Sequence, residues 1–167
     1  MKMQVSRSLP SDQDSATELL NYFVSVRAKT LDLCSSLEVE DFGVQPMADA
    51  SPPKWHLAHT TWFFEAFLLK VFKENFEPFH ESFGYLFNSY YIRVGHPFPR
   101  SDRGNLSRPT VKEVMQYRTE TESKVIDLIT DLERFDQKSQ QEILSVLRVG
   151  IEHEQQHQDC LLYTSPS

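Results

Sequence analysis

Two histidines near the C-terminal end of the chain, His153 and His157, have a spacing that suits a metal ion. They are four residues apart, which on a helix places their Cβ atoms roughly 6 Å apart on one face. Two imidazoles so placed can reach one metal ion at about 2.1 Å each. A third ligand must come from another segment, and His59 is the natural candidate because it lies on the apolar stripe of a second predicted helix. The sequence therefore predicts a metal site made of His59, His153 and His157.

Three neutral imidazoles without a thiolate leave two metals open. Zinc would bind three histidines and a water molecule, whereas iron(II) would bind them on one face of an octahedron and keep positions open for substrate and O₂. The spacing alone does not decide between these metals. Of the other histidines, His56 is expected either to contact the ligands without binding the metal itself or to face the solvent. His80 and His96 lie in a segment without helical period and are expected at the surface.

The segment from His153 to His157 also matches the HExxH pattern of zinc proteases. Those enzymes usually take a third metal ligand well downstream of the pattern. Only ten residues follow His157, and none of them is histidine. The pattern alone therefore does not predict a protease.

Composition restricts the class of protein. The chain has 167 residues, of which 40% are hydrophobic and five are glycine, as in a helix-rich globular domain. The formal net charge of −7 argues against general affinity for nucleic acid. Two cysteines, Cys34 and Cys160, cannot make a disulfide framework and favour a reducing compartment. Because the sequence has neither a signal peptide nor an apolar run of membrane-spanning length, we expect a cytoplasmic protein.

Apolar periodicity predicts four long amphipathic helices, of which the first two precede a long connection. The first is expected from about Ser15 to Leu37, with Cys34 in the core. The second is expected to begin with Ser51 as its cap and two prolines in its first turn. Residues 1–12 have no such pattern and are expected to form a flexible leader.

The last two helices follow a long segment, from Glu74 to Pro109, that has no helical period and is rich in Phe, Tyr, Pro and Gly. A connection of that length in a compact domain is usually functional or a lid. The third helix is expected to begin at Thr110, which forms a capping-box pattern with Glu113, and to reach about Phe135. The fourth is expected to start near Ser139. This order predicts an all-α four-helix bundle with a long irregular insert between helices two and three.

Several long motifs resemble one family. The run from Ser51 to Glu65, SPPKWHLAHTTWFFE, resembles the second helix of the DinB-like domain of ergothioneine-biosynthesis sulfoxide synthases, also called hercynine oxygenases. Four further runs resemble this family in the same order: YLFNSYY (85–91), PRSDRG (99–104), LSRPT (106–110) and HEQQHQ (153–158). Together the motifs cover about Ala16 to Asp159, which is nearly the whole chain.

The resemblance implies a DinB-like iron-binding domain over residues 13–159 and a mononuclear non-haem iron(II) enzyme. Members of the family use O₂ to join a cysteine-type thiol to the imidazole C2 of Nα-trimethylhistidine and oxidise the sulfur to a sulfoxide. The resemblance assigns the Fe(2+) ligands to His59, His153 and His157. It also implies that Arg100 and Arg103 form a clamp for the carboxylate of the thiol substrate, since planar forked donors suit carboxylates.

The resemblance also predicts that parts of the natural protein are missing or replaced. Full-length members continue into a C-terminal domain like the formylglycine-generating enzymes, which supplies most of the trimethylhistidine pocket and a catalytic tyrosine. No such domain is found in these 167 residues, so we expect the isolated chain to bind metal without turning over. Residues 160–167 resemble the conceptual translation of a transposase sequencing adapter. We therefore expect them to be non-native, and residue 159 to be Glu in the natural gene.

Two other classes of protein would also account for the three histidines. The first is a stand-alone DinB-like thiol transferase that uses zinc or nickel, which would lack the long aromatic insert. The second is a non-catalytic helical module in which the histidines are merely packed in the core. A purified protein that is fully stable without metal would favour the second alternative.

Overall fold

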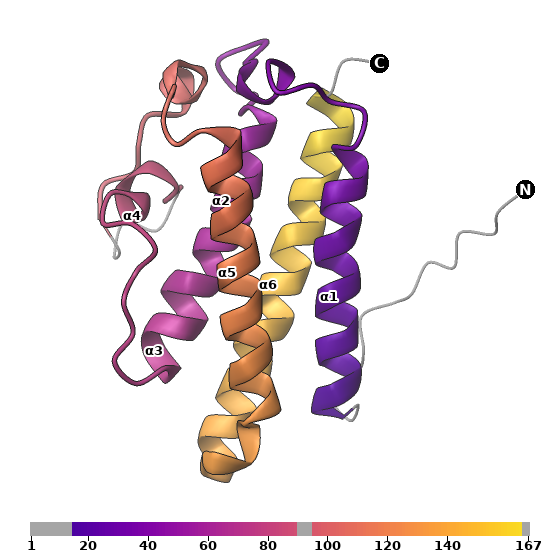
Figure 1. Cartoon of the computed structure of the whole chain (residues 1–167), viewed down its shortest axis with the longest axis vertical. Helices are drawn as coiled ribbons and strands as arrows, with labels where there is room; N and C mark the ends of the chain where they lie inside the picture. Colours follow the sequence, from indigo (N-terminus) through magenta and orange to yellow (C-terminus); the bar gives the residue numbers. More distant parts are fainter. Residues whose placement is uncertain (1–14, 90–94, 165–167) are drawn as a thin grey trace, which may run out of the picture.

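Four long helices lie side by side (Figure 1). The computed structural model describes residues 15–89 and 95–164, and the regular structure in those ranges is all helical, which confirms the predicted all-α class. None of the helices described there combines the length and the apolar character needed to cross a membrane. The predicted leader, residues 1–12, lies outside the described ranges. The long helices are α1 (Ala16–Leu33), α2 (Pro53–Phe64), α5 (Val111–Thr130) and α6 (Gln137–Thr164).

Capping boxes begin two of these helices. The Thr110 side chain accepts a hydrogen bond from the Glu113 N–H at 3.2 Å, and the Glu113 carboxylate accepts from the Thr110 N–H at 2.7 Å, as the sequence predicted. Ser15 and Glu18 form the same reciprocal pair at the start of α1. Each pair satisfies two backbone N–H groups that have no partner within the helix.

Other helix ends differ from the prediction by a few residues. The first helix stops at Leu33, where Cys34 N–H bonds back to the carbonyl of Leu31 in a tighter turn. Cys34 is buried, as predicted. The third helix ends at Thr130 and is followed by the short 3-10 turn η5 (Leu132–Arg134). The fourth starts earlier than Ser139 because the carboxylate of Asp136 accepts from the Ser139 N–H at 3.0 Å.

The second helix begins without a side-chain cap. Its N-cap residue is Pro52, so the prediction that Ser51 caps this helix is wrong. The Ser51 hydroxyl instead accepts a hydrogen bond from the guanidinium of Arg103 at 2.9 Å. After Phe64 the helix continues through a π-helical turn, η2 (Glu65–Leu69), into the short α3 (Lys70–Phe72). Such π turns within helices are found frequently at functional sites.

The second helix is also not amphipathic, although the sequence predicted an apolar stripe. Every residue of α2 is buried, including Lys54, His56 and His59. The reason is its central place: α2 contacts α5, α6 and the short turn η1 (Asp41–Gly43), and the insert covers the remaining side. A helix that is enclosed on all sides has no solvent face, so its polar side chains must find partners inside the protein.

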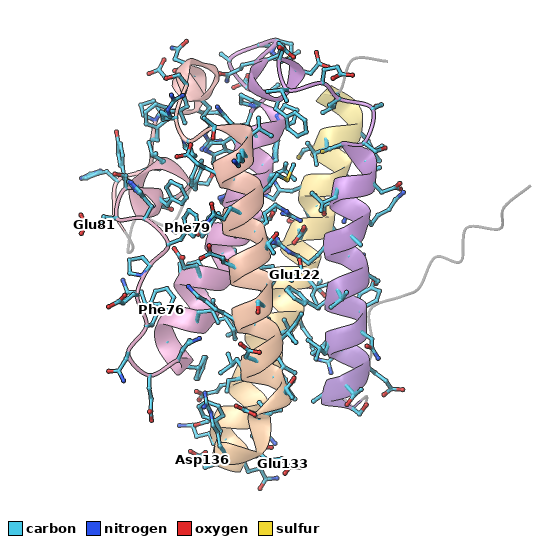
Figure 2. The ribbon with its side chains drawn as sticks, viewed as in Figure 1. Phe76, Phe79, Glu81, Glu122, Glu133 and Asp136 are labelled. Carbon is cyan, nitrogen blue, oxygen red and sulfur yellow. The ribbon has the colours of Figure 1, made fainter. Side chains whose placement is uncertain are left out.

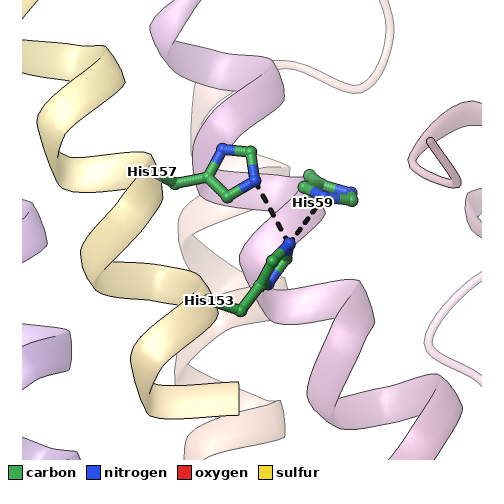
Figure 3. Close-up of side chains that lie close together, drawn as sticks. All are labelled: His59, His153 and His157. Carbon is green, nitrogen blue, oxygen red and sulfur yellow. Dashed lines mark hydrogen bonds between the residues drawn. The ribbon is translucent and has the colours of Figure 1, made fainter. Parts of the chain in front are cut away.

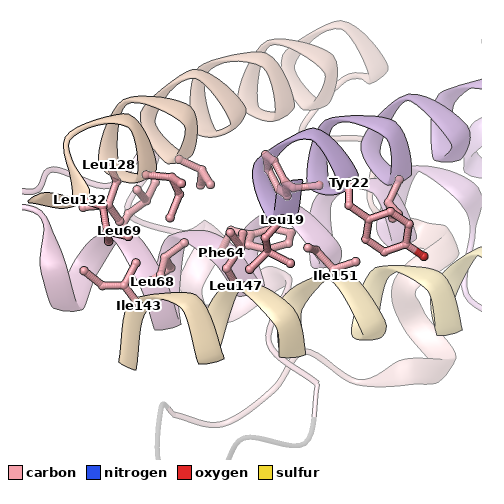
Figure 4. Packing of buried hydrophobic residues seen from close by; sticks show 14 residues of the cluster. Leu19, Tyr22, Phe64, Leu68, Leu69, Leu128, Leu132, Ile143, Leu147 and Ile151 are labelled. Atoms are coloured by element: carbon pink, nitrogen blue, oxygen red, sulfur yellow. The ribbon is translucent and has the colours of Figure 1, made fainter. Parts of the chain in front are cut away.

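One of the hydrophobic cores of the protein is a cluster of buried aliphatic and aromatic side chains that does not include the histidines (Figure 4). Phe64 lies at its centre, fully buried and in edge-to-face contact with Phe23, with ring centroids 5.0 Å apart. The other members come from α1, the η2 turn, α5, η5 and α6: Leu19, Tyr22, Val26, Leu68, Leu69, Val125, Leu128, Ile129, Leu132, Ile143, Leu147 and Ile151.

Substitution of Gly150 by Ala is expected to destabilise the protein by about 1–3 kcal/mol, because the added methyl overpacks this core. A Cβ at Gly150 would lie 2.3 Å from a ring carbon of Phe64, which is too close for the ring to stay in place. The better helix propensity of alanine, worth about 1 kcal/mol, offsets only part of this cost. Urea unfolding measures the effect. Gly84→Ala is the control, because nothing lies within 4 Å of its Cβ; equal stability of the two variants would contradict the packing described here.

The insert between α3 and α5 folds onto the helices through aromatic side chains (Figure 2). It contains the one-turn helix α4 (Phe83–Leu86) and the 3-10 turn η4 (Arg100–Asn105), and its other described residues are irregular, as predicted. Phe79 stacks on Phe83 and contacts the Tyr117 ring at 5.1 Å. The Phe79 N–H also donates to the carboxylate of Glu65 at 3.1 Å, which ties the insert to the π turn.

Candidate metal centre

Three imidazole nitrogens converge where α2 faces α6 (Figure 3). His153 Nε2 lies 3.1 Å from His59 Nε2 and 3.2 Å from His157 Nε2. All three potential ligand atoms lie within 4.8 Å of one another. The sequence predicted this trio, and the structure brings its members together from two helices.

The insert fixes which nitrogen of His59 faces the other two rings. His59 Nδ1 lies 2.6 Å from the backbone carbonyl oxygen of Phe87. Since a carbonyl only accepts hydrogen bonds, Nδ1 must carry the proton, and Nε2 is left with a free lone pair. Phe87 follows the last residue of α4, where helix carbonyls lack partners within the helix. The neighbouring carbonyl of Leu86 accepts in the same way from Trp55 Nε1 at 3.0 Å.

Two tryptophans hold the plane of the His59 ring. Trp55 stacks on one side at 4.5 Å between centroids with an interplanar angle of 14°, and Trp62 is near-parallel at 5.7 Å. The guanidinium carbon of Arg103 lies 3.4 Å above the Trp55 ring, in a cation–π contact. A continuous stack therefore runs from Arg103 through Trp55 to His59. The ring of this potential ligand cannot turn without moving its neighbours.

Of the two positions expected for His56, the structure shows the one in contact with the ligands and not the one facing the solvent. His56 is 5% exposed, and its Nδ1 lies 2.7 Å from His157 Nδ1. Residues three apart on a helix are separated by 300°, or 60° the other way, so His56 and His59 both face α6. His157 can therefore point Nε2 toward the other two histidines while His56 holds its Nδ1 side, as in metal sites where a second residue orients the ligand.

The three histidines are neutral at physiological pH. Burial lowers the pKa of His153 to about 4, and burial together with the neighbouring His56 lowers that of His157 to about 2. Burial, with His157 and His153 as neighbours, also holds the pKa of His59 well below its usual value. Neutral imidazoles offer lone pairs, which metal coordination requires.

These pKa shifts predict that the metal-free protein loses stability as the pH falls from about 7 to about 5. An unfolded histidine takes up a proton near pH 6.5, whereas folded His153 stays neutral until about 4. In this window the unfolded state binds more protons, so the free energy of unfolding falls with pH. Urea unfolding in the presence of a chelator measures the loss. His153→Leu is expected to lose less over the same range, and an equal loss in both proteins would contradict the depressed pKa.

The donor set fits a divalent metal ion that prefers nitrogen. With metal–nitrogen bonds of about 2.1 Å, two adjacent imidazole nitrogens lie about 3.0 Å apart on an octahedral ion and about 3.4 Å apart on a tetrahedral ion. The distances of 3.1 and 3.2 Å from His153 Nε2 fall in this range. A cation bound by all three rings needs one lone pair from each, and the hydrogen bond from His59 Nδ1 to Phe87 leaves such a lone pair on His59 Nε2. The geometry therefore supports a metal and accommodates either coordination number.

A cavity of about 370 Å³ opens beside the histidines, and both predicted arginines line it. Arg100 is exposed at its rim, whereas Arg103 is 4% exposed and held by Trp55 and Ser51. Both arise from the η4 turn, which Gln45 fastens: its side chain donates to the Arg100 carbonyl at 2.8 Å and accepts from the Gly104 N–H at 2.6 Å. The cavity thus combines a potential metal site with two positive charges, of which that of Arg103 is held in place by Trp55 and Ser51.

The glutamate of the HExxH pattern lies outside this cavity. Glu154 is fully buried on another face of α6, where it binds Arg27 and Arg118. Burial raises its pKa, but the two guanidinium groups outweigh burial and bring the value to about 2. In a protease of this pattern the glutamate activates a metal-bound water, which Glu154 does not reach here. The other histidines of the insert, His80 and His96, are exposed, as predicted.

Comparison with known proteins places the chain in a family. Residues 22–161 match the model of the DinB superfamily. None of the curated proteins matches the sequence. The matched region runs from within α1 to near the end of α6 and includes His59, His153 and His157. Since the match covers most of the sequence, the chain belongs to the DinB superfamily.

Proposed function

We propose that this chain is the iron(II)-binding N-terminal domain of an O₂-dependent sulfoxide synthase of ergothioneine biosynthesis. The observation that carries the proposal is the opening of a three-imidazole set onto a cavity that Arg100 and Arg103 also line. The motifs that surround these residues in the sequence support it further. We also propose that α1, α2, α5 and α6 form the DinB-like four-helix bundle of that family.

The residues of the chain would divide the work of the site. His59, His153 and His157 would hold the ion, and iron(II) when bound supplies open positions for the thiol, the imidazole of Nα-trimethylhistidine and O₂. Arg103 offers a positive charge whose place is fixed by Trp55. Arg100, which is exposed at the rim, would bind the carboxylate of the incoming thiol. The pair would thereby orient the thiol toward the three histidines.

The trimethylhistidine pocket and the catalytic tyrosine belong, in this proposal, to a second domain of the natural protein. The isolated chain is therefore expected to bind metal and thiol but to form no sulfoxide. Chromatography with mass detection, after incubation of the iron-loaded chain with both substrates in air, checks this expectation. Steady formation of the sulfoxide would show that the chain is a complete enzyme.

Cobalt(II) tests the thiol-binding part of the proposal. A thiolate bound to cobalt(II) gives an intense charge-transfer band, so the cobalt-loaded chain is titrated separately with cysteine, γ-glutamylcysteine and serine. The two thiols are expected to produce the band, and serine is not. Arg100→Ala is expected to weaken thiol binding about 10-fold, since it removes a charged hydrogen bond. A cobalt-loaded chain that gives no band with either thiol would overturn the proposal.

A stand-alone DinB-like thiol transferase is separated from this proposal by a second assay. Such an enzyme needs no further domain and would transfer a thiol to an electrophile when loaded with zinc or nickel. The chain is therefore incubated with each metal, a thiol and a fluorogenic electrophile. Our proposal predicts no turnover above the metal-free background, and turnover with zinc or nickel would favour the transferase.

A further inference from the structure

The glutamate that makes the HExxH pattern is joined to two of the other long helices, α1 and α5, by buried polar contacts. Glu154, which follows His153 on α6, is completely buried. Its carboxylate accepts hydrogen bonds from Thr30 at 2.7 Å, Arg27 at 2.9 Å and Arg118 at 3.0 Å. Thr30 and Arg27 lie on α1, and Arg118 lies on α5. One side chain of α6 is thus held by two neighbouring helices.

The two arginines extend the network to α2, which carries His59. Arg118 donates to the Leu57 carbonyl and to the Thr60 hydroxyl, both at 3.2 Å. Arg27 donates to the Thr61 hydroxyl at 3.1 Å. These α2 residues flank His59 in the sequence. The same charge network therefore holds the two helices from which the three histidines project.

Two glutamines reinforce the side of α6 that faces α1. Gln155 donates to the Tyr22 hydroxyl at 2.9 Å, and Gln158 donates to the carbonyl of Val26 at 2.9 Å. Meanwhile His153 and His157 face α2. The helix α6 lies beside α1 (Figure 1) and also contacts α2, and contacts on both sides define its rotation about its own axis.

Rotation of α6 is the motion to which the histidine cluster is most sensitive. An imidazole nitrogen lies roughly 6 Å from the helix axis, so a turn of about 20° would move it by about 2 Å. A displacement of that size is as large as a metal–nitrogen bond. A contact that fixes the rotation of α6 therefore sets the metal affinity, even if it never touches the metal.

We infer that Glu154 is a positioning residue that locks the rotation of α6 through Thr30, Arg27 and Arg118, and thereby aims His153 and His157 at His59. The inference rests on the proposed metal site. It replaces the role that the HExxH pattern suggests for this residue, because a glutamate enclosed by two arginines is not free to activate water.

Metal affinity of the folded protein tests this role. Cobalt(II) is titrated into the wild-type chain and into Glu154→Gln, and the visible absorption bands report on the ligands. Glu154→Gln is expected to bind about 10-fold to 100-fold more weakly and to show altered bands. The control is Glu122→Gln, which contacts the same Arg27 at 3.5 Å from the partly exposed edge of the network (Figure 2). Its affinity is expected to stay within about 2-fold of the wild type.

The outcomes separate the inference from the proposed function. Failure of the wild-type chain to bind cobalt overturns the metal site, and the inference with it. Wild-type binding with the same affinity and the same bands in folded Glu154→Gln overturns the positioning role alone. If circular dichroism shows that Glu154→Gln does not fold, Thr30→Val carries the test, because it removes the 2.7 Å bond to Glu154 and the 2.9 Å bond from Gln158 but keeps both ion pairs of Glu154. Several-fold weaker binding then supports the inference, and unchanged affinity overturns it.

Discussion

His153→Ala is expected to bind iron(II) at least about 100-fold more weakly than the wild-type chain. His153 Nε2 is the central atom of the cluster, with the nitrogens of His59 and His157 3.1 and 3.2 Å away. Its removal leaves two ligands, whereas a tight site of this kind needs at least three from the protein. Even the loss of a residue that only hydrogen-bonds to a metal ligand lowers metal affinity by about 10-fold to 100-fold. Anaerobic titration with a competing chelator measures the change.

His59→Ala is expected to behave in the same way, and His80→Ala serves as the matched control. His80 is an exposed histidine of the insert and lies outside the cluster. Its substitution removes one imidazole from the chain without touching the site, so iron affinity should not change. Wild-type affinity in His153→Ala or in His59→Ala, or a comparable loss in His80→Ala, would contradict the assignment of the ligands.

Arg118→Ala is expected to lower the free energy of unfolding by about 3–5 kcal/mol, the usual cost of removing one partner of a buried ion pair. The guanidinium group binds Glu154 at 3.0 Å and also donates to the carbonyls of Leu57 and Arg27. Its removal leaves these acceptors buried with fewer donors. Burial and the nearby Arg27 lower the pKa of Arg118 to about 10, so it remains charged at neutral pH. Urea unfolding at neutral pH measures the loss.

Arg134→Ala shows what an exposed arginine contributes. Arg134 lies 4.0 Å from Asp131, and both side chains are more than half exposed. Such pairs contribute less than about 1 kcal/mol. The difference in the free energy of unfolding between Arg118→Ala and Arg134→Ala therefore measures the contribution of the buried ion-pair network. An Arg118→Ala variant that unfolds at the same urea concentration as Arg134→Ala would show that the network does not stabilise the fold.

Local sequence signals were sufficient for most of the helices. The capping box of Thr110 and Glu113 depends on two side chains three residues apart, and the structure contains both of its hydrogen bonds. The fourth helix was expected near Ser139 and begins two residues earlier, at Gln137, because the carboxylate of Asp136 accepts from the Ser139 N–H. In each case the interaction is local, so spacing alone can reveal it.

Features that depend on contacts between distant segments could not be read in this way. The burial of α2 on all sides follows from its place among other helices and the insert, not from its own pattern. Ser51 looked like a cap, but its hydroxyl accepts from Arg103, which is 52 residues away. A cap and a tertiary contact use the same hydroxyl, and the sequence does not show which donor reaches it.

In the candidate site too, features set by local spacing were predicted, and features set by contacts between distant segments were missed. His59, His153 and His157 were found because helical spacing and an apolar stripe place their side chains. The carbonyl of Phe87 was missed because every residue has a carbonyl, so no residue type marks it. For His56 the sequence left two positions open, and helix geometry could have decided between them, since a separation of three residues places it only 60° from His59.

Equilibrium dialysis of the purified wild-type chain against iron(II), without oxygen, tests the central claim most directly. Three neutral, converging imidazoles predict one tightly bound iron per chain, and the bound iron should be released as the pH falls and protons compete for the nitrogens. A chain that retains no iron under these conditions would contradict the claim that His59, His153 and His157 form an iron site.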